Sequence, residues 1–249
     1  AVSVVAQVLA GVLIGYVVVS LCESFFHRTV GHASPRLRRL ARGLGAIGSG
    51  VIEVWYGHHV VHHCRTFRRD HVTQFESAHA EQRLRCELIA KGRRRMVAES
   101  YGARVGGVIG FLRHMGPTLP VFAAVCWLGG GWFTVGAVLP LLLMPLLSEF
   151  VHPYLHLSDE RVLREAPAPI RWFAATPAFR FLARHHWLHH RYLDCNFNLM
   201  PGGDLLLGVH RRPSPADLAE MAAIGLAMPT GSVPCRGQAI PPCGPASAG

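Results

Sequence analysis

The sequence predicts an all-α, multi-pass integral membrane protein that carries a histidine-rich site on its cytosolic side. Three observations lead to this fold class: half of the 249 residues are hydrophobic, only 16% are charged, and the apolar residues gather into long runs. The mean hydropathy is +0.26. This composition excludes a disordered or fibrous chain and is too apolar for an ordinary soluble monomer, while the length fits one domain.

The first apolar run covers residues 1–22 and contains no charged side chain. A helix of this length is about 33 Å long, which is enough to cross the hydrocarbon core of a bilayer. Glu23 and His27 follow directly, where a signal peptide would have a small-residue cleavage site. We therefore expect a retained membrane span.

The second apolar region, residues 105–148, contains only Arg113 and His114 as charged or imidazole side chains. The glycine triplet at 129–131 predicts a turn near its middle, so the region is expected to form a membrane hairpin. Two placements of the first arm stay open. An arm that starts at residue 105 puts Arg113 inside the bilayer, and an arm that starts at Met115 is short.

Interfacial helices are expected over residues 43–57, an apolar stretch too short for a span, and over residues 160–184, which prolines interrupt. Residues 77–99 are strongly charged, have a helix-forming composition and predict a solvated helix. Residues 229–249 are rich in Pro, Gly, Ser and Ala and predict a disordered tail, which leaves residues 1–228 as the single domain.

The basic excess indicates the orientation in the membrane. Lys and Arg total 25 against 15 Asp and Glu, and the net charge is +10. By the positive-inside rule, the Arg-rich segments 28–42 and 65–104 face the cytoplasm. The charge is thereby explained without nucleic acid, for which the sequence has no recognition motif. The seven cysteines lack metal-binding spacing and indicate free thiols, and the Arg, Ala and Gly bias is typical of a GC-rich bacterial genome, hence of a bacterial cell membrane.

Ten of the 16 histidines fall into four short boxes. The boxes are HRTVGH (His27, His32), HVVHH (His59, His62, His63), HPYLH (His152, His156) and HWLHH (His186, His189, His190). An even spread would place only about 1.4 histidines in these windows, so the clustering indicates a common role. Ten imidazoles exceed the four ligands of a structural zinc site, and two metal ions with open coordination positions are expected.

Helical spacing explains how the boxes can act together. Histidines at positions i, i+3 and i+4 lie on one face of an α-helix, so HVVHH and HWLHH each aim three imidazoles at one point. HPYLH aims two, and HRTVGH fits a helix end that turns into a loop at Gly31. His58 offers an HxxxHH alternative to His59, and His185 stands beside His186; the HxxHH frame is favoured at both boxes.

The two halves of the chain have similarly spaced histidine boxes. His27 and His152 are 125 positions apart, and the HVVHH and HWLHH boxes are 127 positions apart. Glu23 and Glu149 stand 126 positions apart, each about one helical turn before the first box of its half. We expect a pseudo-twofold site to which each half contributes five imidazoles.

Several polar residues near the boxes could orient the metal ligands from outside. These candidates are Glu23, Glu149, Asp194, Asn196 and Asn198; ion pairs with arginines are an equal alternative for the acids, and turn capping is the favoured role of the asparagines. Four isolated histidines, His71, His79, His114 and His210, are expected not to bind metal. The aromatic residues near the boxes are assigned to the membrane-interface belt rather than to a substrate channel.

Four motifs between residues 20 and 212 carry a family resemblance: HRTVGH, WYGHHVVHH, EFVHPYLH and RHHWLHHRYLDCNFNLMPGGDLLLG. Together they resemble the fatty acid hydroxylase superfamily, which includes the sterol desaturases, the sphingolipid fatty acid 2-hydroxylases and, more distantly, the carotenoid ring hydroxylases. The resemblance implies a membrane di-iron oxygenase with the ten box histidines as ligands. The gaps between His32 and His59 and between His156 and His186 are long for this pattern.

The resemblance also implies the chemistry. Members use O2 and two external electrons, here expected from a ferredoxin or cytochrome b5-like donor, to hydroxylate or desaturate a C–H bond of a lipid or apolar-chain substrate. Hydroxylation is the favoured expectation, desaturation the alternative, and zinc could replace the two irons in purified protein. A divalent-metal transporter is the competing class; it would place ligands near the bilayer midplane, whereas these boxes lie at helix ends beside Arg-rich loops.

Overall fold

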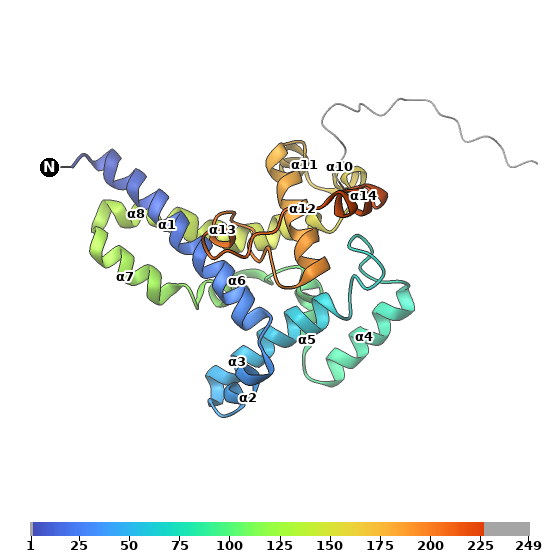
Figure 1. Cartoon of the computed structure of the whole chain (residues 1–249). Helices are drawn as coiled ribbons and strands as arrows, with labels where there is room; N and C mark the ends of the chain where they lie inside the picture. The colour runs from blue at the N-terminus through green and yellow to red at the C-terminus, as the bar shows by residue number, and fades with distance from the viewer. Residues whose placement is uncertain (1, 227–249) are drawn as a thin grey trace, which may run out of the picture.

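The computed structural model describes residues 2–226, and these residues form helices without any strand (Figure 1). The first half contains α1 (Val4–Phe26), η1 (His27–Gly31), α2 (Pro35–Arg42), α3 (Gly45–Trp55), η2 (Tyr56–His63), α4 (Ala78–Ala90), α5 (Arg94–Ala98) and η3 (Ser100–Gly102). The second half contains α6 (Gly107–Met115), α7 (Leu119–Gly129), α8 (Gly131–Leu146), η4 (Leu147–Val151), α9 (His152–Leu155), α10 (Asp159–Glu165), α11 (Ala168–Ala174), α12 (Pro177–Tyr192), α13 (Gly203–Leu206) and α14 (Pro215–Ala223). The all-α prediction is confirmed for the described residues.

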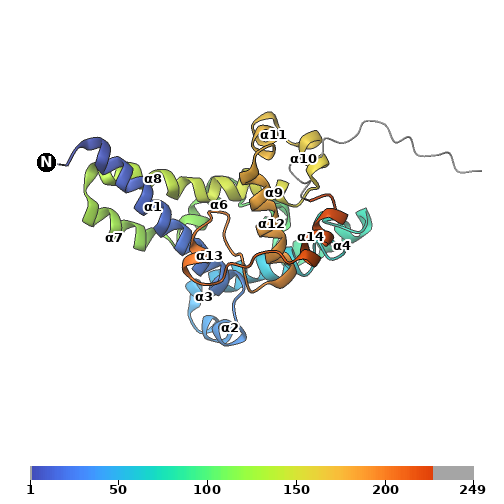
Figure 2. The same ribbon diagram turned by 45° about the horizontal axis from the view of Figure 1, so that its top comes forward.

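Two continuous helical stretches are long and apolar enough to cross a membrane, Val4–Gly31 and Gly131–Leu155. Their main parts, α1 and α8, lie side by side in Figures 1 and 2 and pack closely. Small residues permit this approach: a Cβ atom added at Gly11 would overlap the backbone of Phe133, and one at Gly136 would overlap that of Val8. Close contact through glycine is how helices associate where no hydrophobic effect drives them together.

The expected first arm of the hairpin is not one straight helix. The turn forms at the glycine triplet as predicted, between α7 and α8, but α6 and α7 meet at an angle of 68°. Arg113 lies near the end of α6, before the bend, and pairs with Glu99. Both alternatives from the sequence therefore stay open: as one bent span the pair contains Arg113 and makes a third crossing, and without α6 the arm is only the 11 residues of α7.

The helix predicted over residues 43–57 is α3, and it runs on without a break into the π-helical η2. The charged helix predicted over residues 77–99 is divided: α4 starts after Ser77, whose hydroxyl accepts from the N–H of Ala80, and the chain breaks at Gly92 before α5. The N-cap of α4 follows the usual Ser pattern.

The region predicted as one or two helices over residues 160–184 contains three. Proline begins two of them, since Pro167 caps α11 and Pro177 opens α12. α12 continues to Tyr192 and therefore carries the last histidine box on a regular α-helix. The predicted tail at 229–249 lies outside the described residues.

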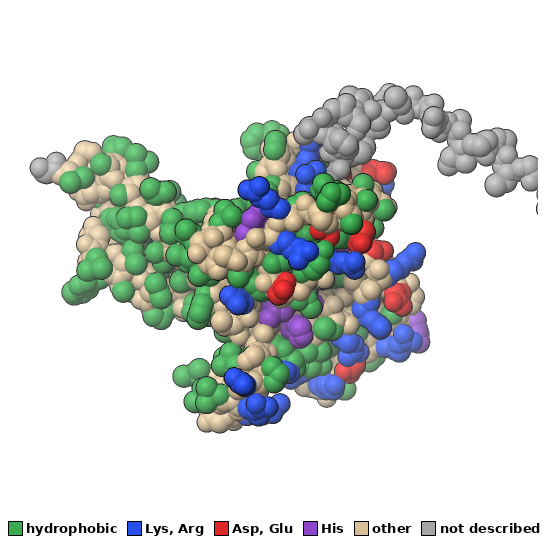
Figure 3. Space-filling model, viewed as in Figure 1, with side chains coloured by type: hydrophobic (Ala, Val, Ile, Leu, Met, Phe, Trp, Pro, Cys, Tyr) green, Lys and Arg blue, Asp and Glu red, His purple; other side chains and the backbone are tan. Residues whose placement is uncertain are grey.

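The molecule has two chemically different ends. Figure 3 shows hydrophobic side chains over the end that Figure 1 assigns to α1, α7 and α8, whereas arginines, lysines and acidic side chains gather at the other end. Large apolar residues stay exposed at the first end, among them Trp127 with 87% and Leu128 with 85% of their surface accessible. An apolar surface of this kind favours contact with lipid.

Candidate metal centre

Histidines from η1, η2, α9 and α12 converge at the inner ends of α1 and α8. They form two principal groups of potential metal ligands, in each of which one ligand atom per residue lies within 4.8 Å of the others. The first group is His27, His32, His58, His63 and His189, and the second group is His62, His152, His156 and His186. His190 joins them, because it also groups with His62 and His63.

The Nε2 atoms of the first group face one another at close range. Nε2 of His58 lies 2.7 Å from that of His27, 2.9 Å from that of His63 and 3.2 Å from that of His32. Nε2 of His189 lies 3.2 Å from those of His32 and His63. Nitrogens that bind one ion at about 2.1 Å and at right angles lie about 3.0 Å apart, so these separations match neighbouring ligands of one ion.

Hydrogen bonds to carbonyl groups fix which nitrogen carries the proton in the second group. Nδ1–H of His152 donates to the carbonyl of Ala103 at 2.9 Å, and Nδ1–H of His156 donates to that of His71 at 3.2 Å. In a neutral imidazole, Nε2 is then an unprotonated acceptor. Nε2 of His186 lies 2.9 Å from both of these acceptors and cannot aim a single N–H at both, whereas one cation can satisfy all three.

Two histidines cross between the halves of the chain. His62 belongs by sequence to the N-terminal half but lies in the second group, and His189 belongs to the C-terminal half but lies in the first group. Nδ1–H of His189 donates to the carbonyl of Cys195 at 2.9 Å, which leaves its Nε2 free for the first group. The boxes of each half supply five clustered histidines, with His58 in place of His59, and His71 adds a sixth to the first half; the two sets are interleaved.

The structure corrects the frame of the second box. His59 lies outside all groups, and His58 takes its place in the first group. The reason is the helix type: η2 is a π-helix, in which i→i+5 hydrogen bonding widens each turn. Residues five apart, such as His58 and His63, therefore share a face. The first box follows the same rule, since the N–H of His32 donates to the carbonyl of His27.

His71, expected not to bind metal, lies in a group with His156 and His190. Its Nε2–H donates to the carbonyl of Leu155 at 3.0 Å, so its Nδ1 is the unprotonated nitrogen. That Nδ1 is buried and has no hydrogen-bond partner among the described residues. The sequence offered no signal for it, because His71 stands eight positions after the second box.

The two glutamates do not orient imidazoles. The carboxylate of Glu23 accepts from the backbone N–H groups of Leu199 and Met200, both at 3.0 Å. The carboxylate of Glu149 accepts from two successive backbone N–H groups at residues 105 and 106, both at 3.0 Å. Each glutamate thus holds a loop segment against its helix, and Glu149 also pairs with Arg104 at 3.6 Å, which is the ion-pair alternative expected from the sequence.

The remaining outer candidates also have other roles. Asp194 is exposed. The side chain of Asn196 exchanges two hydrogen bonds with the backbone of Arg211, 15 residues further along the chain, so it joins two segments and does not cap a turn as the sequence favoured. Asn198 donates to the hydroxyl of Ser20 at 2.9 Å and ties α1 to the segment after α12.

Other residues near the cluster were not singled out from the sequence. Asp204, on α13, accepts from Nε2–H of His185 at 3.0 Å and from the hydroxyl of Ser24, so His185 is held away from the metal groups. Phe197 packs against three histidines of the first group, with its ring centroid 5.3 Å from that of His189. Phe67 stacks on His156 of the second group at 4.0 Å.

Burial keeps the donors neutral. Loss of water, together with the neighbouring imidazoles, lowers the pKa of His62, His186 and His190 well below the usual value near 6.5. Burial also lowers the pKa of His71 to about 3 and that of His189 to about 4. Neutral imidazole is the form that binds metal, so these residues are ready donors at neutral pH.

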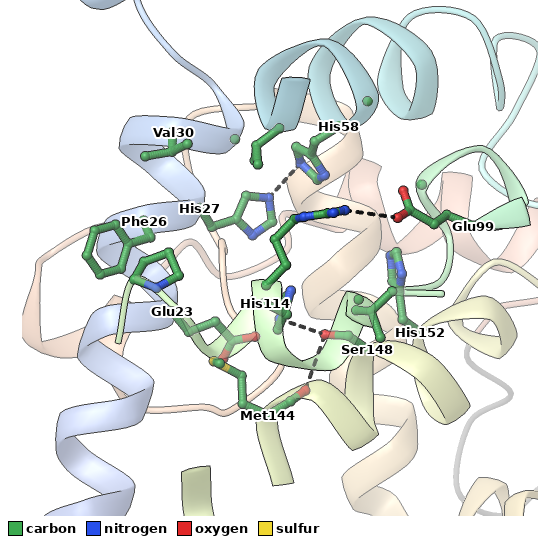
Figure 4. A pocket seen from close by; sticks show the side chains of 18 of the residues that line it. Glu23, Phe26, His27, Val30, His58, Glu99, His114, Met144, Ser148 and His152 are labelled. Carbon is green, nitrogen blue, oxygen red and sulfur yellow. Dashed lines mark hydrogen bonds and ion pairs between the residues drawn. The ribbon is translucent and has the colours of Figure 1, made fainter. Parts of the chain in front are cut away.

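A cavity of about 260 Å³ lies against the cluster and reaches both groups. His27 and His58 line it from the first group, and His152 and His186 line it from the second. Figure 4 shows His27 and His58 on one side of this space and His152 on the other. A molecule in the cavity would therefore contact both candidate metal positions.

The other walls of the cavity are mainly apolar. Phe26 and Val30 line it from the first helix, and Met144 lines it from α8. Polar groups interrupt this surface: Arg113 lies 3.8 Å from Glu99, and the hydroxyl of Ser148 lies 3.2 Å from Nε2 of His114. Four more charged residues line the cavity, Glu23, Glu53, Arg95 and Arg104. The lining therefore suits a ligand with an apolar body and a polar group.

The arrangement of histidines, the neutral donors and the apolar cavity define a site that could hold metal ions beside an apolar ligand. Comparisons with protein-family models, with curated proteins and with solved structures find no match to this chain.

Proposed function

We propose that this protein is an O2-dependent, di-iron membrane oxygenase that hydroxylates a C–H bond of a lipid or another apolar-chain substrate. One observation carries the proposal: two groups of converging imidazoles share one apolar cavity, whose wall includes histidines of both. A structural metal site needs no cavity, and a binding pocket needs no such excess of donors.

The residues fit iron in kind and in number. Neutral imidazole suits Fe, and the interleaved groups supply more donors than a four-coordinate zinc site uses. When bound, iron would activate O2 for an attack on a C–H bond, which no side chain can perform alone. Zinc, which prefers the same ligand, would occupy the site without supporting this chemistry.

The side chains of the cavity position the substrate. Phe26, Val30 and Met144 offer an apolar wall, so an alkyl chain or ring system fits there better than a sugar or a nucleotide. The helices that carry these residues belong to the two candidate spans, so a lipid in the bilayer lies beside the cavity. The buried histidines opposite exclude bulk water from the reacting bond.

The Arg-rich segments favour an orientation with the histidine cluster at the cytoplasmic face of a bacterial cell membrane. Two electrons per turnover must then come from a cytosolic carrier such as a ferredoxin or cytochrome b5-like protein. No nucleic acid is needed to account for the charge. Desaturation of the same substrate stays the alternative outcome, because both reactions start with removal of one hydrogen atom.

A divalent-metal transporter is the weaker candidate. Transport sites lie on broken helices near the bilayer midplane and open to both sides in turn. Here His27 and His152 lie near the ends of the two candidate spans, and several donors are tied to carbonyl groups of neighbouring segments. Hydrogen bonds from the non-ligating ring nitrogen hold each imidazole in one orientation, which favours a permanently bound metal over a transported one.

Metal content and reactivity with O2 test the proposal. The protein is purified in detergent from iron-supplemented cells without oxygen, and its iron is measured by mass spectrometry and Mössbauer spectroscopy before and after exposure to O2. We expect about two irons per chain and an O2-dependent spectral change that is absent in His62→Ala and His189→Ala. Tightly bound zinc that iron never replaces, without any response to O2, would refute an oxygenase.

A further inference from the structure

The two histidine groups differ in their distance from the surface. All four members of the second group are buried, whereas four of the five members of the first group are only half-buried. Figure 3 shows histidine side chains at the surface in the middle of the charged end, next to the part that Figure 1 assigns to α2 and α3. Electrons from outside therefore have their shortest path through the first group.

A chain of ring contacts leads from this surface to the first group. Nδ1 of His59 lies 3.0 Å from Nδ1 of His32, and the rings of His59 and Trp55 stack with centroids 6.2 Å apart. The guanidinium of Arg38 covers the other end of this chain, 4.1 Å from the ring centre of Trp55. His59 thus connects a candidate ligand to a half-exposed indole without being a ligand itself.

The surface around this path is basic. Between residues 24 and 52 the chain contains five arginines and no acidic residue. These are Arg28, Arg36, Arg38, Arg39 and Arg42, and within residues 2–226 none of them forms an ion pair. Elsewhere, basic residues such as Arg65 and Lys91 are neutralised by Glu87. The uncompensated charge attracts an acidic partner.

We propose that the face formed by α2 and the Trp55–His59 edge is the docking surface for a small, acidic one-electron carrier protein with an iron–sulfur or haem centre. The inference rests on the proposed oxygenase function. Each docking event transfers one electron from the reduced carrier by way of Trp55, His59 and His32. Two such events, with two protons, one O2 and one substrate C–H bond, give one hydroxyl group and one water.

Charge complementarity favours a protein over anionic lipid as the occupant. Lipid headgroups could bind the arginines equally well, but lipid binding does not explain an aromatic path that ends at a candidate ligand. A carrier protein needs both the charges, which steer the encounter, and a short route for the electron.

Affinity is the first readout. The protein is placed in phosphatidylcholine nanodiscs, and binding of an acidic [2Fe–2S] ferredoxin is measured by biolayer interferometry at low and high salt. Arg36→Glu with Arg39→Glu should weaken binding at least about tenfold and abolish its salt dependence. The matched control, Arg83→Glu with Arg85→Glu on α4, makes the same charge change at exposed positions and should change affinity less than about twofold.

The path is tested separately from the docking. In Trp55→Leu and His59→Phe, stopped-flow reduction of the metal centre should slow at least about tenfold even at saturating ferredoxin, where a change in affinity no longer limits the rate. Reduction by dithionite with methyl viologen, which needs no docking surface, should be equal in all variants. Unchanged ferredoxin rates in both would refute the path.

Two outcomes overturn the docking proposal. If the α2 and α4 double variants weakened ferredoxin binding equally, the attraction would have no defined surface. If the α2 variant bound ferredoxin normally but lost co-purified anionic lipid, the arginines would bind lipid headgroups. If methyl viologen could not reduce the metal centre of the wild-type protein, the proposed function would be contradicted instead. Ferredoxin affinity is scored independently of that result.

Discussion

Two segments of this chain share one pattern but use it differently. HHVVHH at residues 58–63 and HHWLHH at residues 185–190 both present two pairs of histidines. The first segment directs His58 to the metal groups and leaves His59 out, whereas the second directs His186 and leaves His185 out. The difference is one of helix type, because residues 56–63 form a π-helix and residues 177–192 form an α-helix.

The two histidines left out have also taken different roles. His59 is half-exposed and contacts Trp55, while His185 is buried and hydrogen-bonded to Asp204. The same HHxxHH pattern therefore produces a surface contact in one segment and a buried polar network in the other. The same pattern encodes different outcomes because the turn length decides which histidine faces inward.

The largest expected effect separates the two frames. His58→Ala and His186→Ala should each lower metal affinity more than about 100-fold, since loss of an orienting partner alone costs 10–100-fold. His59→Ala should keep the metal. Mass-spectrometric metal content after dialysis against a chelator checks this, and metal loss in His59→Ala without loss in His58→Ala would restore the HxxHH frame.

The crossing of His62 and His189 predicts nearly equal losses from opposite halves of the chain. Alanine at either position should weaken the ion held mainly by the other half, by about 100-fold. Chelator titration of the two ions in each variant measures this. If either variant retained both ions at wild-type affinity, the interleaved arrangement would be wrong.

Substitutions of His185 and His59 should differ in their effect on protein stability rather than on metal binding. His185→Ala removes one of the hydrogen-bond donors of buried Asp204, which costs about 2 kcal/mol of unfolding free energy. His59→Ala removes a half-exposed contact and should change that free energy by less than about 1 kcal/mol. Thermal unfolding of both variants in one detergent gives the comparison.

His71 tests how far the second group extends. His71→Ala should weaken one ion about tenfold, because it removes a candidate donor nitrogen from a set that keeps its other members. His79→Ala on exposed α4 is the matched control and should have no effect. Equal metal content and affinity in both variants would confine His71 to its hydrogen bond with Leu155.

Acid should destabilise the metal-free protein through the buried histidines. Their folded pKa values lie below 6.5, so the unfolded chain binds more protons once the pH falls below about 6.5. The free energy of unfolding then falls by up to about 1.4 kcal/mol per pH unit for each such histidine, down to its folded pKa. Thermal unfolding at pH 8, 6.5 and 5 should show a small loss in the upper interval, where the unfolded histidines begin to bind protons, and a loss about fourfold larger in the lower interval. His71→Ala should show a smaller loss.

The apolar pattern was sufficient to predict the helical class, the first long apolar helix and the turn at the glycine triplet. It did not reveal the 68° bend between α6 and α7, which falls at Gly116 and Pro117, because apolarity continues through a break that the proline makes. Spacing identified nine of the ten clustered box histidines and offered His58 only as the alternative to His59, because no residue preference separates a π-turn from an α-turn in η2. His71 and Asp204 reach the site through tertiary packing, which spacing along the chain does not reveal.

The crossing of His62 and His189 makes metal uptake a late event in assembly. Neither half of the chain contains a complete set of donors, so an ion can be fully coordinated only after α12 has docked against η2. From then on, each ion stabilises the joined halves according to its concentration relative to its dissociation constant. Under the proposed function, iron supply would thus govern how long a newly made chain persists, as well as how fast it turns over.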